Sequence, residues 1–579
     1  MSLLTVALTC AVLFAAAYYF YGRLLSRLFR LNRDAQTPAV ALRDDVDYVP
    51  IEPKFLLGQH FSAIAAAGPI VGPILAGLMF GWLPALIWIV VGSIFIGGVH
   101  DFAALVASIR HKAGSIAQII REQMTRTSYL LFMIFVWIAL VYVVVAFTDI
   151  VANSFVGKQT LENGVVVTGG GIAASSMIYL ALPVLMGLVL RFTKMSLGAA
   201  TLIFLPLVGA AIWVGQYIPL DVAKLVGLNP DNAVRLWDLL LLAYCFVASL
   251  APMWILLQPR GHLGGYFLYC ALGAGFLGVL FGGHSVEYPA FTGWSTAGGD
   301  MLFPMLFITI ACGACSGFHA LIASGTTSKQ LKYETDARPV GYGTMLLEGM
   351  VAVISLCCLM MLPRNSGITN PNYIYASGIG SFLQIIHVPV AFGISFGLLA
   401  FTTFVYDTLD VCTRLGRYIL QELTGWQGKA GRWVATAVTV TVPLFFVIQK
   451  VTDAAGRPIP AWKLFWPLFG ASNQLLAALT LLGITVWLYR TRRAWWVWPV
   501  VGAPGAFMYV MSMWALIGFI KRGFIKPLAE LRQAPGDIVS WVALLLAGLS
   551  LMLLVEAARV FIKVRRTPPG LPAEAEAAL

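Results

Sequence analysis

The residues most able to do chemistry in this chain are ionisable side chains inside long apolar segments. Glu348 stands in GYGTMLLEGM, and His319 stands in a second apolar segment. Asp101 lies near the end of a third, and His60 precedes a segment interrupted by prolines. A charge in hydrocarbon is costly unless it is paired or neutralised, so such groups are candidates for carrying a proton. We predict ion coupling through Glu348 first and His319 second, with Asp101 and His60 as further candidates; the alternative for Glu348 is a structural salt bridge to a lysine or arginine.

Two glycine–proline pairs interrupt one apolar segment. In GQHFSAIAAAGPIVGP, Gly68-Pro69 and Gly72-Pro73 fall near its middle, and each proline removes a helical N–H. Freed backbone groups are tolerated in a membrane only where they are buried or line a wet cavity. We therefore predict unwinding between Gly68 and Pro73, the alternative being a kinked helix packed through small residues.

A second interruption is predicted in FVASLAPMWILLQPRG, between Ser249 and Pro252. Broken helices in transporters point a positive half-helix end at the middle of the membrane, where it can hold a carboxylate. We expect the two breaks and the Ser316–His319 face to form one substrate cavity. The predicted substrate-binding residues are Gly68, Pro69, Gly72, Ser249, Pro252, Trp254, Ser316 and Phe318.

The segment ITIACGACSGFHALIASGTTSKQL permits other interpretations. Hydroxyls of Thr326 and Thr327, with a freed carbonyl near Ala65, are an alternative sodium site. Ser316 and His319 are a Ser–His pair on one predicted helix, which would allow an intramembrane serine protease, although residues three apart seldom aim at each other. The CxxC formed by Cys312 and Cys315 is interpreted as packing, and no metal site is predicted.

Composition sets the class of protein that must position these residues. Of 579 residues, 59% are hydrophobic and 11% charged, whereas a soluble protein carries about 25% charged residues. This excludes a water-soluble enzyme, a disordered chain and a coiled coil. The net charge of +12 lies in short clusters between apolar runs, which is typical of membrane flanks and not of nucleic-acid binding. The sequence therefore predicts an all-α polytopic membrane protein that is embedded in a lipid bilayer.

Windows of about 20 apolar residues predict about 15 transmembrane helices. Most of the 38 Lys and Arg fall on one side if the N-terminus is outside and the C-terminus inside. The predicted organisation is a first span and cytoplasmic linker (1–57), a five-span repeat (58–216), an inverted five-span repeat (236–406), additional spans (407–566) and a disordered tail (567–579).

Six motifs in order resemble the carbon starvation protein family, CstA. They are GQHFSAIAAAGPIVGPILA (58–76), ASLAPMWILLQPR (248–260), CSGFHALIASGTTSKQL (315–331), GYGTMLLEGMVA (341–352), TLDVCTRLGRYILQEL (408–423) and FWPLFGASNQLLAAL (465–479). The resemblance implies a bacterial inner-membrane transporter of peptides or pyruvate with a five-plus-five inverted-repeat (LeuT-like) core. His100 stands where the family pattern leads us to expect glutamine, which leaves the substrate open.

The combined expectation is a secondary transporter that imports a small, pyruvate-like carboxylate or a short peptide. The resemblance favours protons over sodium as the coupling ion, and a channel is a further alternative. The sequence has no GxxxxGK[ST] motif for nucleotide binding, and we expect no cofactor and no nucleic-acid partner.

Overall fold

The computed structural model describes residues 2–44, 48–65, 67–160, 166–252, 254–363, 366–426, 428–449, 459–525 and 537–566. Apart from one hairpin, in which β1 (Lys158–Thr160) pairs antiparallel with β2 (Val166–Thr168), the regular structure of these residues is helical. The predicted disordered tail lies outside the described residues.

Thirteen helical segments are long and apolar enough to cross a membrane. They are α1 (Leu3–Leu28), α5–η1–α6 (Trp82–Gly92, Ser93–Gly97, Gly98–Arg110), α8 (Arg126–Val156), α9 (Gly169–Phe192), α10 (Leu197–Tyr217), α12 (Pro230–Leu250), α13 (Leu257–Phe281), η3–η4–α17 (Glu334–Asp336, Arg338–Gly343, Thr344–Met360), α19 (Val390–Thr424), α20 (Gly428–Val447), α21 (Ala461–Arg492), η6–α22–η7 (Trp498–Gly502, Ala503–Ile520, Lys521–Ile525) and α24 (Ile538–Arg566).

Two of the predicted spans are interrupted. The apolar segment with the two Gly–Pro pairs is a pair of helices, α3 (Pro53–Ile64) and α4 (Gly68–Phe80), bent by 48°. The apolar segment that contains Ser316 and His319 is three short helices, α14 (Leu302–Thr309), α15 (Ala311–Ala314) and α16 (Gly317–Gly325), which we call the interrupted segment. By length and composition the described residues therefore contain 13 candidate spans, or 14 with the bent pair. Short helices complete the fold: α2 (Pro38–Ala41), α7 (Ile116–Gln123), α11 (Val222–Val226), η2 (Thr327–Lys329), α18 (Pro371–Leu383) and η5 (Gln384–Ile386).

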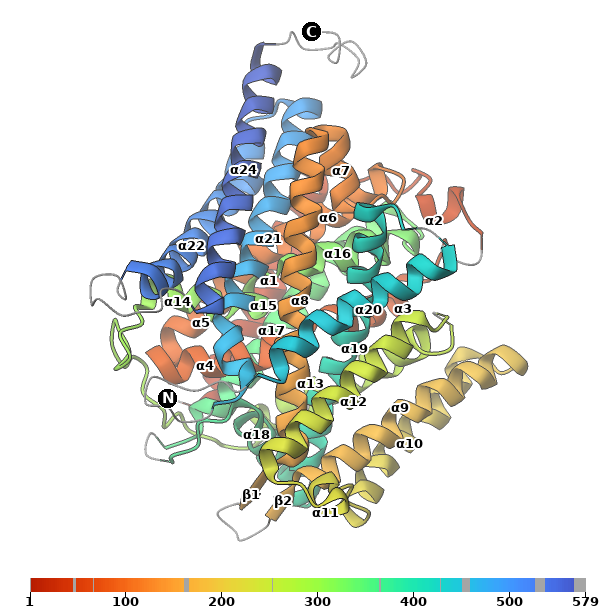
Figure 1. Cartoon of the computed structure of the whole chain (residues 1–579), viewed down its shortest axis with the longest axis vertical. Helices are drawn as coiled ribbons and strands as arrows, with labels where there is room; N and C mark the ends of the chain where they lie inside the picture. Colours follow the sequence, from red (N-terminus) through yellow and green to blue (C-terminus); the bar gives the residue numbers. More distant parts are fainter. Residues whose placement is uncertain are drawn as a thin grey trace.

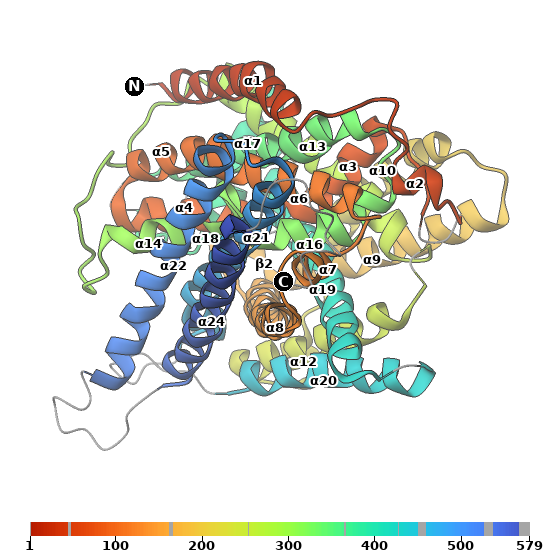
Figure 2. The same cartoon turned by 90° about the horizontal axis from the view of Figure 1, so that it is seen from above.

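The arrangement separates a packed interior from an apolar exterior. Helix α8 passes through the bundle and is seen end-on in Figure 2, while α1, α9 and α10 lie at the periphery in that view. Figure 1 shows α9 and α10 side by side at one edge of the bundle. Peripheral helices expose large apolar side chains, such as Phe20 (71% exposed) and Leu202 (79%). Such a surface is unfavourable in water and is suited to contact with lipid.

The break in the α3–α4 pair lies earlier than predicted. Helix α3 ends at Ile64 and α4 already begins at Gly68, so the predicted unwinding from Gly68 to Pro73 is wrong. Pro69 occupies the first turn of α4, where its missing N–H has no helical partner to lose. Pro73 lies inside α4 without interrupting it.

The interruption predicted at Ser249–Pro252 does not divide a single span. Helix α12 ends at Leu250 and α13 begins at Leu257, and each is long enough to cross a membrane. Pro252 therefore lies in a connection between two helices. The second interrupted helix of the fold is instead the one at 302–325.

Glycines let neighbouring helices approach the backbone of the interrupted segment. A Cβ added at Gly470 of α21 would lie 1.9 Å from the Ile308 carbonyl oxygen, and one at Gly97 would lie 2.3 Å from the Ala314 carbonyl oxygen. A Cβ at Gly72 of α4 would lie 2.5 Å from the carbonyl oxygen of Thr309. Only glycine permits backbone contact at these distances, as at other membrane helix interfaces.

We predict that Gly470→Ala destabilises the protein by about 1–3 kcal/mol, because the new methyl must displace the Ile308 backbone. The measurement is the midpoint of thermal unfolding in detergent. Gly209→Ala in α10 is the matched control, because a Cβ there meets nothing within 4 Å. An equal unfolding midpoint for the two variants would show that the interrupted segment is not held by this contact.

Candidate ion-coupling and substrate site

Three helices bring two acids and two histidines together in the interior. Asp101 and His100 come from α6, His319 from α16 and Glu348 from α17, and all four side chains are fully buried. The sequence prediction nominated Asp101, His319 and Glu348 separately, and the structure places them in one contiguous cluster, which we call the acid–histidine cluster.

The two imidazoles share the Asp101 carboxylate. His100 Nδ1 lies 2.8 Å from Asp101 Oδ1, and His319 Nδ1 lies 2.8 Å from Asp101 Oδ2. The other ring nitrogen of His319, Nε2, lies 3.2 Å from Glu348 Oε2. His319 thus has a carboxyl at each ring nitrogen, an arrangement in which one imidazole can take a proton on one side and release it on the other.

Glu348 has no basic partner other than this histidine. Within the described part of the chain, no lysine or arginine forms an ion pair with it, and neither carboxyl oxygen accepts a hydrogen bond. A carboxyl buried in this position is more stable when it holds a proton, or shares one with His319, than when it is ionised. The salt-bridge alternative for Glu348 is therefore not what the structure shows.

His60 lies in α3, and its hydrogen-bond partner is a threonine outside the acid–histidine cluster. It is buried, and its Nδ1 lies 2.8 Å from the Thr327 hydroxyl. The Thr326 hydroxyl donates to the Ile322 carbonyl of its own segment. Both threonine hydroxyls proposed for a sodium site thus have protein partners. Ala65 is the last residue described before the α3–α4 break, and its N–H donates to Phe61.

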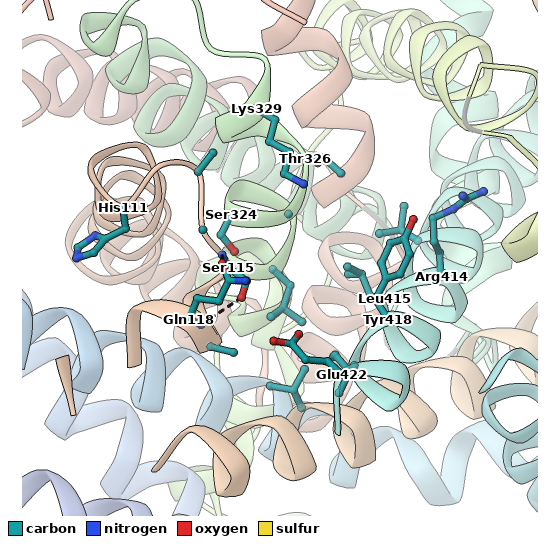
Figure 3. Close-up of a pocket in the computed structure, with 18 of the residues that line it drawn as sticks. His111, Ser115, Gln118, Ser324, Thr326, Lys329, Arg414, Leu415, Tyr418 and Glu422 are labelled. Carbon is teal, nitrogen blue, oxygen red and sulfur yellow. Dashed lines mark hydrogen bonds between the residues drawn. The ribbon is translucent and has the colours of Figure 1, made fainter. Parts of the chain in front are cut away.

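A cavity of about 1050 Å³ lies between α7, α8, α16 and α19. Figure 3 shows side chains of Ser115, Gln118, Ser324 and Glu422 around it. A small recess beside it is lined by His60 and Asp407 and shares Leu257 and Thr326 with the cavity wall. The charged residues that line the larger cavity are Lys112, Arg121, Lys329, Arg414, Glu122 and Glu422, and His111 lines it as well.

A second cavity, of about 740 Å³, lies at the other end of the interrupted segment. Thr309, next to the break at Ile310, lines it together with Trp462, Lys463 and Trp466 of α21. The first cavity reaches Ser324 and Thr326 at the opposite end of the same segment. The residues between Ile310 and Ala320 thus lie between two cavities.

Asn473 of α21 holds the second break in the interrupted segment. Its side-chain oxygen accepts the Phe318 N–H (3.0 Å), and its amide nitrogen donates to the Ser316 hydroxyl (3.0 Å) and to Cys312 Sγ (3.3 Å). The segment is not the single helix that was predicted to carry Ser316 and His319, because it is interrupted at Cys315–Ser316. Ser316 is bonded to Asn473 and His319 to Asp101, so each has a partner of its own.

A buried ion network, missed in the sequence prediction, joins α3, α13 and α19. The Arg260 Nε donates to Asp407 Oδ1 at 2.5 Å, and its Nη1 pairs with Asp410. Ser62 of α3 donates to Asp407 Oδ2 at 2.7 Å, and Tyr244 of α12 donates to Asp410 at 2.9 Å. The sequence carried part of the signal, because the two aspartates in the apolar run FVYDTLD satisfy the same rule that selected Glu348.

The remaining predicted substrate residues separate into two groups. Gly68 and Gly72 of α4 lie against Cys312 and Thr309, and Pro69 lies beside Gly313, so all three contact the interrupted segment. Ser249, Pro252 and Trp254 lie away from it, at the α12–α13 connection. The Trp254 ring lies under Arg191 of α9, at 5.6 Å. The predicted convergence of both groups on one cavity is not what the structure shows.

Comparison with known proteins gives a consistent family. The family model described as "Carbon starvation protein CstA" matches residues 2–370 and 365–515. The pyruvate/proton symporter BtsT of Escherichia coli is 31% identical over 89% of this chain and 81% of its own length. The peptide transporter CstA of Helicobacter pylori (strain J99) is 31% identical over 85% and 78%, and that of Bacillus subtilis is 29% identical over 94% and 95%. A solved mutant manganese transporter of Eremococcus coleocola covers 91% of this chain at 15% identity, with a TM-score of 0.44.

We predict that Asn473→Ala lowers the thermal unfolding midpoint and the transport rate, because three buried partners lose their hydrogen bonds at the break. The expected cost is about 1–3 kcal/mol of stability. Asn153→Ala in α8 is the control, since that amide donates to a carbonyl of its own helix. If both variants unfold and transport alike, Asn473 does not hold the break.

Proposed function

The chain belongs to the carbon starvation protein CstA family, and from this premise we propose that it is a proton-coupled secondary transporter that imports a small carboxylate or a short peptide across the bacterial inner membrane. The observation that carries the proposal is the fully buried line of contacts from His100 through Asp101 and His319 to Glu348. His319 belongs to the interrupted segment, whose two ends line the two cavities.

Charge balance gives the cluster a reason to bind protons. Two ionised carboxylates beside two neutral imidazoles carry a net charge of −2 in a site without exposed surface. Uncompensated charge is strongly disfavoured there, so protons bind to reduce it. An anionic substrate bound nearby adds further negative charge and favours another proton, which links substrate binding to proton uptake.

Two cavities at opposite ends of the interrupted segment support an alternating-access mechanism. We propose that substrate passes from the cavity at Thr309 to the cavity at Thr326 by rearrangement of the residues between Ile310 and Ala320. The substrate contacts predicted at Gly68, Pro69, Gly72, Ser316 and Phe318 lie along that passage. The backbone there is already non-helical at Ile310 and at Cys315–Ser316, so movement need not break a continuous helix.

We propose an inverted repeat whose halves begin at α3 and at α14, which replaces the boundaries 58–216 and 236–406. Each half starts with an interrupted helix, and each has a short helix, α7 or α18, before its long helix, α8 or α19. Helix α13 packs on α3 and α19, and α21 packs correspondingly on α16 and α8. The two interrupted helices run in opposite directions, because α3 contacts α16 while α4 contacts α14 and α15. The α9–α10 pair is then an addition to the first half.

The N-out orientation places the larger cavity on the cytoplasmic side, where its lysines and arginines satisfy the positive-inside rule. Its lining has four lysine or arginine side chains and two glutamates, which suits an anion. The carboxyl of Glu422 accepts a hydrogen bond from the Tyr129 hydroxyl. A carboxylate substrate leaving toward the cytoplasm would therefore pass Lys329 and Arg121.

Protons fit this site better than sodium. The alternative sodium site needs the hydroxyls of Thr326 and Thr327, and both have protein partners. A hydroxyl that donates its hydrogen keeps lone pairs that can contact a cation. The preference for protons therefore rests on the acid–histidine cluster, whose buried carboxyls have no lysine or arginine partner among the described residues.

We predict that Glu348→Gln abolishes substrate accumulation driven by a proton gradient in proteoliposomes and retains exchange of labelled for unlabelled substrate. Exchange needs no net proton movement, whereas accumulation needs a group that releases its proton. The assays use labelled pyruvate and labelled dipeptides, with proton and sodium gradients imposed separately. Glu287→Gln, at an exposed acid, is the control and should accumulate normally. Accumulation by Glu348→Gln at the unmodified rate would make this carboxyl structural.

We predict that Lys329→Gln lowers the affinity for an anionic substrate on the cytoplasmic side about tenfold, because a charge-assisted contact is lost. The readout is the concentration of internal substrate that half-saturates exchange. Arg565→Gln, at an exposed basic residue of α24, is the matched control. An unchanged half-saturation concentration would show that Lys329 does not contact the substrate.

A further inference from the structure

Three arginines meet at the C-terminal end of α12. Arg414 of α19 donates to the carbonyls of Ala248 (2.7 Å) and Ala251 (2.9 Å). Arg432 of α20 donates to the Leu250 carbonyl. Arg417 lies one helical turn from Arg414, and its guanidinium lies over the Tyr418 ring, 4.4 Å from the ring centroid. We call these three residues the arginine site.

The arginine site has more donors than partners. Arg417 is only 2% exposed, and its Nε and Nη1 are buried without a hydrogen-bond partner; the Nε atoms of Arg414 and Arg432 are likewise unpartnered. Among the described residues no carboxylate forms an ion pair with any of the three. The nearest acids along α19 are taken, since Asp410 pairs with Arg260 and Glu422 accepts from Tyr129.

Unsatisfied buried donors are costly, and those of a charged group more so. Four buried guanidinium nitrogens on these three arginines lack a hydrogen-bond acceptor, and an anion with several oxygens would supply one. A phosphate group supplies these and matches the planar guanidinium fork. The two non-bridging and two ester oxygens of a phosphodiester point in several directions around phosphorus, whereas both oxygens of a carboxylate lie in one plane, so the phosphodiester suits guanidinium groups from separate helices better.

The position of the site identifies the source of the phosphate. Helices α12 and α20 lie side by side at the edge of the bundle in Figure 2. Next to Arg432, Trp433 is 57% exposed and its ring packs on Phe246. Exposed tryptophan beside arginine is typical of headgroup depth in a membrane. We propose that the arginine site binds the phosphate of an anionic phospholipid, with Arg417 at its centre.

The bound lipid would link three helices at one point. Its phosphate would bridge the end of α12 to α19 and α20, and α19 also carries Asp407 and Asp410 of the buried ion network. The arginine site shares Arg414 with the lining of the larger cavity but includes no residue of the acid–histidine cluster, so the proposal stands independently of proton coupling.

The test is native mass spectrometry of the full chain in detergent, titrated with phosphatidylglycerol. We expect Arg417→Gln and Arg432→Gln each to weaken the tightest binding step about tenfold. Arg23→Gln, at an exposed arginine of α1 expected at the same membrane face, should leave that step unchanged. Arg432 is only partly buried, so Arg432→Gln should fold and test the proposal even if Arg417→Gln does not fold.

A second arm separates the two sources of phosphate. The delipidated protein is heated with inorganic phosphate or with phosphatidylglycerol, and the unfolding midpoint is measured. Stabilisation by the lipid alone, lost in Arg432→Gln, supports the proposal. Equal stabilisation by inorganic phosphate, or equal lipid affinity in all the variants and the unmodified chain, would overturn it.

Discussion

The proposed mechanism of this protein depends on the cost of burying charge. That cost is concentrated where His319 contacts a carboxyl on each side. Asp101 and Glu348 have no exposed surface, and between them stands one imidazole. Neither carboxyl has an arginine or lysine partner within the described residues. Protons are therefore the simplest means by which this cluster can lower its net charge. In the proposed mechanism, its position beside the helix breaks lets that charge change when substrate binds.

This cluster exists only because an interrupted helix can be held in a membrane interior. Irregular backbone must be buried in protein or line a cavity. Here Ser93 donates to the Gly313 carbonyl, and Gln474 donates to the Phe307 carbonyl. The side-chain oxygen of Asn473 accepts a hydrogen bond from the Phe318 N–H. Glycines of α4, η1 and α21 bring their helices close enough for these bonds. The same contacts that satisfy the break direct His319 toward Asp101.

Local sequence patterns were sufficient for the class of fold and for three of the four members of the acid–histidine cluster. Glu348, His319 and Asp101 stand out because ionisable groups are rare in apolar runs. The break in the α3–α4 pair was expected from its Gly–Pro pairs, although at a slightly later position. The interrupted segment was misread as one helix, because its breaks at Ile310 and Cys315 involve no proline and are imposed by Asn473 and by packing against glycines. No local signal distinguished Pro252 in a connection from a proline within a span, and Asp407 was overlooked although the rule that found Glu348 applies to it.

Substrate-driven proton movement tests the account most directly. Proteoliposomes containing the unmodified chain and an internal pH-sensitive dye are mixed with pyruvate or a dipeptide in sodium-free buffer, without an imposed gradient. The account predicts that the lumen acidifies as substrate enters and that a protonophore abolishes this acidification. Uptake of substrate that requires sodium and moves no protons would contradict it.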